Sequence, residues 1–374
     1  MSSILKSVAD VFSGKHRGRS LGIDIGTSYI KVVETERVNE KAVLKNYGEI
    51  ALGTRAGASV GQVTNLAPEK IAEALKDLLT EAGIVAQHTL FSIPLSSSLL
   101  SVIELPDVKK KELETMIPLE ARRYIPIPLD EVSLDWWILP KIAPEQKTTA
   151  PEGGSQPVGK IEVIIAALHN EVMGKYQTIK QFAHIPGEAS HYEIEIFSSI
   201  RAIVGHGLDA TLVIDLGASS TKLALVDKGV VRGSHIISSG AEEITKALAR
   251  SLSISFDQAE EMKCRTGILG EYEGRDVSTV VQSVLPNMMN EASRFALNYE
   301  QKYQTKLKKV ILVGGGARLK GIEKIVAKYF INASIEVGDP FARVDAPASL
   351  VPTLKKLSPS FAVALGASLR GLEE

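Results

Sequence analysis

The chain has 374 residues, a formal net charge of −1 and 44% apolar residues, a composition typical of a globular protein with about two to three domains. The near-neutral charge gives no electrostatic case for nucleic-acid binding, and the single cysteine, Cys264, excludes an internal disulfide. Apolar runs stay shorter than the ~18 residues that span a bilayer, and no secretory signal peptide is visible.

Residues 1–20 are predicted to be a separate leader. Its apolar residues would share one helical face, with basic residues around and after it. Two interpretations stay open: a short basic amphipathic helix that touches anionic lipid or a partner, and a leader that packs only weakly. So few cationic residues add little membrane affinity, which favours the second interpretation.

The stretch 21–34, LGIDIGTSYIKVVE, predicts a β-hairpin. Apolar residues alternate on both sides of a turn formed by Gly26, Thr27 and Ser28, and the first strand carries one acid, Asp24. Glycine lets the backbone come close to a ligand, and turn amides can point at an anion. Asp24 stands where its carboxylate could hold a divalent ion, directly or through water.

The next elements are predicted to complete a first α/β core. Strands are expected over 43–50 and 90–93. Between them a helix is expected to begin at Pro68, which suits a first helical turn, and to end at Gly83.

An inserted unit is predicted over 96–168. It would contain a strand over 99–105 and a helix over 109–124, in which Pro118 can produce a kink. Its residues 141–160 are rich in Pro, Gly, Ser and Thr and predict a mobile loop.

One motif in that loop is a false match to a P-loop. Residues 154–160 fit the G-x-x-x-x-G-K part, but Ile161 stands where Ser or Thr is needed for magnesium. The stretch also precedes an apolar strand instead of opening a helix, so we reject a P-loop.

A second acid-bearing hairpin is predicted far along the chain. Helices are expected over 171–184 and 192–204, and the stretch 212–226, LVIDLGASSTKLALV, follows. It places Asp215 before a small-residue turn, as the first hairpin places Asp24, which indicates a duplicated unit. A buried acid is costly without a metal or a donor, so two such acids favour a shared clamp for phosphates and magnesium.

A glycine-rich turn is the third motif. A strand over 310–313 runs into Gly314, Gly315 and Gly316, where the backbone could lie against a flat base or ribose. The G-x-G-x-x-G spacing of a dinucleotide-binding turn is missing. Further helices are expected over 240–252, 277–303 and 319–329.

These motifs carry a resemblance to known families. The paired hairpins and the late Val-Gly-Gly-Gly turn resemble the actin, sugar kinase and Hsp-type chaperone superfamily. The run EARRYIPIP over 120–128 and the following Leu-Asp-Trp at 134–136 resemble the PilM family, cytoplasmic actin-like proteins of type IV pilus assembly. The segment with Ala259, Glu260 and Lys263 is similar to the nucleoside-contacting segment of PilM and FtsA proteins.

The resemblance implies an α/β, two-lobed actin-like ATPase fold with duplicated ribonuclease-H-like cores and an FtsA/PilM-type inserted subdomain. The small second-lobe subdomain would span 241–304, and 358–374 would form a C-terminal helix packed back on the core. The implied first-lobe core is 21–95 with 169–207, and the implied second-lobe core is 208–240 with 305–357.

The resemblance also implies an ATP and Mg²⁺ site in a cleft between the lobes. Asp24 and Asp215 would hold the metal, and Glu195, with Glu193 as the reserve candidate, would stand near the attacking water. The other residues implied to bind the nucleotide are Gly26, Thr27, Ser28, Lys31, Gly217, Ser219, Ser220, Thr221, Glu260, Lys263, Gly314, Gly315, Gly316 and Arg318.

The implied function is that of an adaptor on the cytoplasmic face of the inner membrane, with slow, switch-like ATP hydrolysis. Its partner would be the cytoplasmic N-terminal segment of a PilN-like membrane protein, with the pilus motor ATPase as a further candidate and a homo-oligomer left open. Contact with the membrane would be peripheral. The alternatives are a small-molecule kinase of the same superfamily and an FtsA-like filament-forming division protein.

Overall fold

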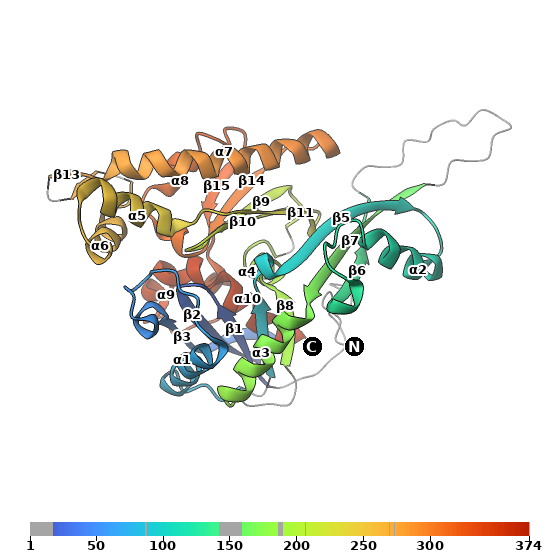
Figure 1. Ribbon diagram of the computed structural model, residues 1–374, viewed down its shortest axis with the longest axis horizontal. Helices are drawn as coiled ribbons and strands as arrows, with labels where there is room; N and C mark the ends of the chain where they lie inside the picture. The colour runs from blue at the N-terminus through green and yellow to red at the C-terminus, as the bar shows by residue number, and fades with distance from the viewer. Residues whose placement is uncertain are drawn as a thin grey trace.

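The chain folds into two α/β lobes that face each other, with a smaller three-stranded unit beside them (Figure 1). The computed structural model describes residues 18–86, 88–141, 159–185, 190–205, 207–268, 270–272 and 274–373. The predictions for most of the leader, for most of the loop 141–160 and for most of the P-loop-like stretch lie outside the described residues. Among the described helices, none combines the length and apolar character needed to cross a bilayer.

The first lobe is built on a five-stranded sheet in the order β3-β2-β1-β4-β8. The predicted hairpin is confirmed, since β1 and β2 pair antiparallel, with Asp24 opposite Lys31. β4 and β8 run parallel to β1 on its other side. The strands are β1 (Arg19–Ile25), β2 (Tyr29–Val38), β3 (Lys41–Ala51), β4 (His88–Ile93) and β8 (Ser190–Ile194).

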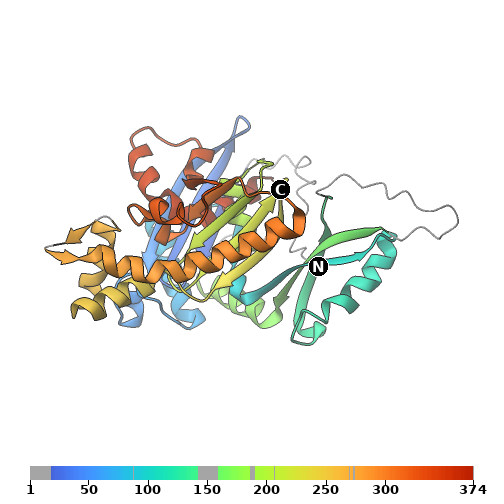
Figure 2. The same ribbon diagram turned by 90° about the horizontal axis from the view of Figure 1, so that it is seen from above.

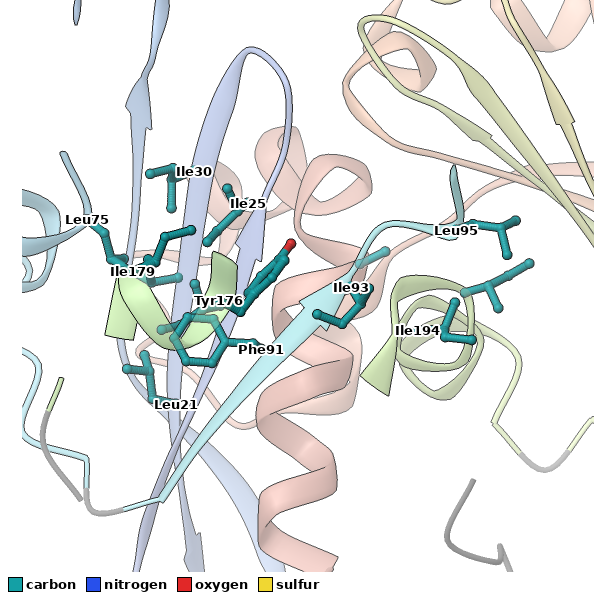
Figure 3. Close-up of a cluster of buried hydrophobic side chains, with 14 of the residues drawn as sticks. Leu21, Ile25, Ile30, Leu75, Phe91, Ile93, Leu95, Tyr176, Ile179 and Ile194 are labelled. Carbon is teal, nitrogen blue, oxygen red and sulfur yellow. The ribbon is translucent and has the colours of Figure 1, made fainter. Parts of the chain in front are cut away.

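Two helices, α1 (Pro68–Glu81) and α3 (Asn170–Phe182), contact each other and pack on one face of this sheet. The alternation along β1 points Leu21 and Ile23 into the same apolar core. Figure 3 shows its centre, where the ring of Tyr176 from α3 lies edge-on to Phe91 from β4 with centroids 5.8 Å apart.

The opposite face of the first sheet is covered by α4 (Glu195–Ile203) and the C-terminal helix α10 (Ala362–Glu373), which contact each other. The approach is so close that glycine is required on both sides. A Cβ on Gly22 of β1 would overlap the carbonyl oxygen of Ala364, and one on Gly366 would overlap that of Ser198. The predicted C-terminal helix is therefore a part of the first lobe, packed backbone to backbone.

The second lobe repeats the plan of the first. Its sheet has the order β11-β10-β9-β14-β15, with β9 and β10 antiparallel and β14 parallel to β9. In the second hairpin Asp215 is opposite Lys222, as Asp24 is opposite Lys31 in the first. The strands are β9 (Thr211–Leu216), β10 (Thr221–Asp227), β11 (Val230–Ile237), β14 (Lys309–Val313) and β15 (Ser334–Val337).

The helices of the second lobe share one apolar core with this sheet. The predicted long helix is confirmed as α7, and Figure 2 shows it running along the lobe, with α5 and α6 at the end opposite the inserted unit. The helices and minor strands of this part are α5 (Ala241–Leu252), α6 (Phe256–Thr266), β12 (Glu271–Tyr272), β13 (Arg275–Asp276), α7 (Val277–Tyr303) and α8 (Ile322–Val326). Helix α9 (Val351–Leu357) lies with the first lobe, because Leu354 packs in one cluster with Val33 and Leu44.

The inserted unit consists of a three-stranded sheet, β5-β7-β6, and the helix α2, around a core of its own. Its charged link to the second lobe centres on Glu162. The two carboxylate oxygens of Glu162 lie 3.2 Å from the guanidinium of Arg232 on β11 and 2.9 Å from the ammonium of Lys302 on α7. The elements are β5 (Ser98–Pro106), α2 (Lys110–Ala121), β6 (Val132–Ile138) and β7 (Lys160–His169).

Two helix predictions are wrong in extent. Residues 190–194 form β8, and the helix expected over 192–204 begins only at Glu195, because Tyr192 pairs with Phe91 on β4 and their rings stack. The helix expected over 319–329 is reduced to α8, which follows Gly321 in the left-handed region at φ 84°. Strand pairing thus overrode the helical pattern in the first case.

Glu193, the reserve catalytic candidate, lies in a buried ion cluster that joins β8 to the covering helices. Its carboxylate accepts hydrogen bonds from Arg201 at 2.7 and 2.8 Å, from Ser198 at 2.5 Å and from Arg370 of α10. Burial alone would raise the pKa of Glu193, but the two guanidinium groups outweigh burial and lower it to about 2. Its contacts assign Glu193 to the packing of α10.

Gly366→Ala and Gly174→Ala should change stability in opposite directions. Both glycines lie inside helices, where alanine is favoured by about 0.5–1 kcal/mol. At Gly174 a new Cβ meets no atom within 4 Å, so the free energy of unfolding should rise. At Gly366 the Cβ overlaps the Ser198 backbone, and overpacking should cost about 1–3 kcal/mol. Urea unfolding of both variants checks this, and equal stabilisation of the two would contradict the packing of α10.

Glu193→Gln should destabilise the protein by roughly 3–5 kcal/mol at neutral pH, because two arginines lose a buried partner. The folded-state pKa lies below the ordinary value of 4.5, so the carboxylate contributes stability above that value and loses it as pH falls toward about 2. The difference from wild type should therefore shrink across this window.

The measurement for Glu193→Gln is the free energy of unfolding at several pH values. Glu120→Gln is the matched control, because Glu120 pairs with Arg123 at an exposed position and should cost about 0–1 kcal/mol. A cost for Glu193→Gln no larger than that of the control would mean that the buried cluster contributes nothing specific to the fold.

Candidate functional site

A cavity of about 310 Å³ lies where the two hairpin turns meet. The turns touch directly, since the Thr27 hydroxyl donates to the Ser219 hydroxyl at 3.2 Å. Sixteen of the predicted site residues share its lining: Asp24, Gly26, Thr27, Ser28, Lys31, Glu195, Asp215, Gly217, Ser219, Ser220, Glu260, Lys263, Gly314, Gly315, Gly316 and Arg318. Segments from both lobes, separated by most of the chain, are thus brought to one place.

Two predicted residues lie elsewhere. Thr221 is fully buried behind the second turn, and its hydroxyl donates to the carbonyl oxygen of Ser239 at 2.9 Å. Glu193 belongs to the ion cluster under α10, as described above. Neither residue is part of the cavity lining.

The two hairpin acids occupy equivalent positions at the ends of β1 and β9. Burial raises the pKa of Asp24, the charges of Lys31 and Lys222 oppose that rise, and the nearby charge of Asp215 adds to it. Asp215 is itself buried, and its carboxylate lies 3.6 Å from the ammonium of Lys222. The two carboxylates therefore act on each other across the cavity, which is the arrangement that a shared cation would stabilise.

Glu195 is the first residue of α4, and its side chain lines the cavity from the first lobe. One carboxylate oxygen accepts a hydrogen bond from the backbone N–H of Leu95 at 2.8 Å, and the other lies 3.1 Å from the Lys222 ammonium. Burial raises the pKa of Glu195, while the positive charge of Lys222 opposes the rise. Two fixed donors from different elements therefore set the orientation of this carboxylate.

Glu260 and Lys263 form the other end of the cavity, as neighbours on α6. Their charged groups are 2.7 Å apart, and the hydroxyl of Thr245 on α5 is hydrogen-bonded to both. The connection between β3 and α1 closes over this end, because the backbone N–H of Val63 donates to Glu242 at 2.9 Å. The first lobe thus reaches across to the small second-lobe helices.

The glycine turn after β14 forms the wall of the cavity beside Asp215. Gly314 has a φ of 85°, and a Cβ there would overlap the Asp215 carboxylate, so only glycine fits. At Gly315 a Cβ would meet no atom within 4 Å. The turn therefore packs tightly against the acid at one residue and leaves open space for a ligand at the next.

Lys222 is the main residue of the lining that our sequence reasoning did not single out. Burial would lower its pKa, but the charges of Asp215, Glu195 and Asp24 raise it, so Lys222 stays cationic. The hairpin repeat held the signal, because Lys222 follows Asp215 at the spacing by which Lys31 follows Asp24. Tyr29, Glu49, Glu242 and Cys264 also line the cavity without having been predicted.

The lining fits a magnesium-bound nucleotide. Two carboxylates supply the oxygen ligands that Mg²⁺ prefers. Two lysines and the glycine-bearing turns supply positive charge and close backbone approach for phosphates, and the open face at Gly315 leaves room for a flat group. The chemistry of the site is therefore that of a phosphate and cation clamp between lobes.

Comparisons with known proteins agree with this architecture. A model of the family described as type IV pilus assembly protein PilM matches residues 22–372. The structure of a PilM-PilN type IV pilus biogenesis complex is similar over 96% of this chain and 100% of that chain, with 25% identity and a TM-score of 0.77.

Further proteins are similar to this chain over most of its length. The cell division protein FtsA of Pseudomonas aeruginosa is 23% identical over 381 residues, 90% of this chain and 85% of that protein. A MamK double helical filament covers 95% of this chain and 99% of its own, with 13% identity and a TM-score of 0.51. The two lobes have the actin-like ATPase fold, and the family match runs through both of them and the inserted unit. The chain belongs to the PilM family of type IV pilus assembly proteins.

Proposed function

We propose that this protein is an ATP-binding adaptor of the type IV pilus assembly platform, on the cytoplasmic face of the inner membrane. The observation that carries the nucleotide part is the meeting of Asp24 and Asp215 on the lining of one cavity. The family supplies the pilus context. Nucleotide binding between the lobes would then bias their relative angle, as in other two-lobed proteins.

In this proposal the two hairpins hold the phosphates from opposite sides. The first contributes Lys31 and the turn beginning at Gly26, and the second contributes the turn beginning at Gly217. Asp24 and Asp215 hold Mg²⁺, mostly through water, and the ion offsets the phosphate charge when bound. The nucleoside end is formed by Glu260, Lys263, Arg318 and the glycine turn 314–316.

Glu195 is the group we assign to the orientation of the attacking water. Its carboxylate already accepts hydrogen bonds from the Leu95 N–H and the Lys222 ammonium. Burial raises the pKa of Glu195, and the positive charge of Lys222 limits that rise. A carboxylate that is already engaged by two donors fits slow turnover. We therefore propose that ATP hydrolysis switches the protein between two conformational states and does not serve rapid ATP turnover.

The partner we propose is the cytoplasmic N-terminal segment of a PilN-like membrane protein. The similar solved structure is a complex of PilM with PilN. A change in lobe angle can reach the inserted unit, because Glu162 joins that unit to Arg232 and Lys302 of the second lobe. Membrane association would come through this partner, and the pilus motor ATPase is a further candidate for contact.

Similarity to FtsA supports one alternative, a filament-forming protein. Electron microscopy of the protein with Mg-ATP, with and without lipid, separates the two. We expect single particles, since the family match is to pilus assembly proteins. Filaments that require lipid would favour the alternative.

Asp24→Asn and Asp215→Asn should each weaken binding of ADP in the presence of MgCl2 by about tenfold or more, which is ~1.4 kcal/mol. Each removes one carboxylate from the proposed cation site. Isothermal titration calorimetry measures the affinity, and Glu69→Gln on the exposed surface of α1 is the control that should bind like wild type. Unchanged affinity in both asparagine variants would contradict the assignment of these acids.

A synthetic peptide with the N-terminal sequence of the PilN-like protein from the same genome should bind the recombinant protein. We expect its affinity to differ between the nucleotide-free and Mg-ATP states, because the lobes and the inserted unit are linked through Glu162. Fluorescence anisotropy with a scrambled peptide as control is the measurement. If the peptide bound in neither state, the adaptor role would lose its support.

A further inference from the structure

The two hairpins differ in what their matched lysines contact. Lys31 and Lys222 occupy equivalent register positions, each opposite the acid of its own hairpin. Lys31 lies over the ring of Tyr29, 5.4 Å from the centroid, and no ion pair between Lys31 and a carboxylate occurs among the described residues. Lys222 instead contacts two carboxylates. The pseudo-symmetry of the sequence is therefore broken at the ammonium groups.

Lys222 already occupies the cation-binding side of Asp215. Its ammonium is 3.6 Å from the Asp215 carboxylate and 3.1 Å from that of Glu195, and its side chain is 19% exposed. The charge of Asp24 acts on it as well. Lys222 therefore lies next to two carboxylates and near a third, at partly buried positions where charge interactions are stronger than in bulk water.

A divalent ion at Asp215 would meet this ammonium as a like charge. Part of the metal's binding energy would therefore be lost to this repulsion, or to moving Lys222 toward Glu195 or toward a phosphate. Without the metal, the Lys222 ammonium partly neutralises the three carboxylates, so they repel a metal-free polyphosphate less strongly. Both effects reduce the advantage of the metal-bound nucleotide over the free one.

We propose that Lys222 is an internal cation that competes with Mg²⁺ for Asp215 and so sets how strongly nucleotide binding depends on Mg²⁺. The inference rests on the proposed nucleotide site and adds a regulatory property to it. Lys222 acts here as a positioning residue for the metal and for Glu195. The charge of Lys31 also acts on Asp24, but Lys31 forms no ion pair with either acid among the described residues, so we assign it chiefly to phosphate binding.

The test compares the affinity for ADP in EDTA with that in saturating MgCl2, by calorimetry, and takes the ratio as the metal coupling. Lys222→Met should raise this ratio by about tenfold, within the range of ordinary coupling energies. Lys222→Arg keeps the charge and should keep the ratio near that of wild type. Lys31→Met should weaken binding in both conditions and change the ratio less than Lys222→Met does, because Lys31 forms no ion pair with Asp24 or Asp215 among the described residues.

A second variant controls for the possibility that Lys222→Met prevents folding. Lys222→Met leaves two buried acids without a cation, so the double variant Lys222→Met/Glu195→Gln restores the charge balance and should also show the raised ratio. A ratio that stays the same or falls in both, while ADP still binds, overturns the role of Lys222 and leaves the nucleotide site standing. Wild-type protein that binds ADP in neither condition overturns the proposed function and this inference together.

Discussion

The fold depends on how negative charge is accommodated where the two lobes meet. Asp24, Asp215 and Glu195 all face one cavity, and Lys222 is the cation that pairs directly with two of them. Burial of Asp215 and Glu195 is offset by the ion pairs that each forms with Lys222, and the charges of Lys31 and Lys222 act on Asp24. The same charges that make the empty cleft costly make it suited to a metal-bound polyphosphate.

Glycine sets the distances that bring these charges together. Gly22 and Gly366 let α10 lie against β1 and α4, which fixes the position of Glu195 at the start of α4. Gly314 lets the turn after β14 pass directly beside Asp215. Side chains larger than hydrogen at these positions would push whole elements apart, so the geometry of the site is a property of backbone packing as much as of the polar residues.

The inserted unit is tied to the second lobe by charge and to the first lobe by chain connectivity. β7 runs directly into α3 of the first lobe, while Glu162 on β7 contacts Arg232 and Lys302 of the second. Arg232 is buried at this junction. Relative motion of the lobes must therefore move the inserted unit or break these contacts, which gives the molecule a physical connection between its cleft and its outer surface.

The sequence by itself determined the elements whose patterns are local. Both hairpins, α1 and α7 follow from alternation, helical periodicity and end signals, and the hairpin repeat placed Asp24 and Asp215 in equivalent settings. Tertiary structure decided the rest. Tyr192 lies in a strand because it pairs with β4. Glu193 is bound by Arg201 and Arg370, and Lys222 forms an ion pair with Glu195. These outcomes depend on contacts between residues far apart in the chain, which no local pattern records.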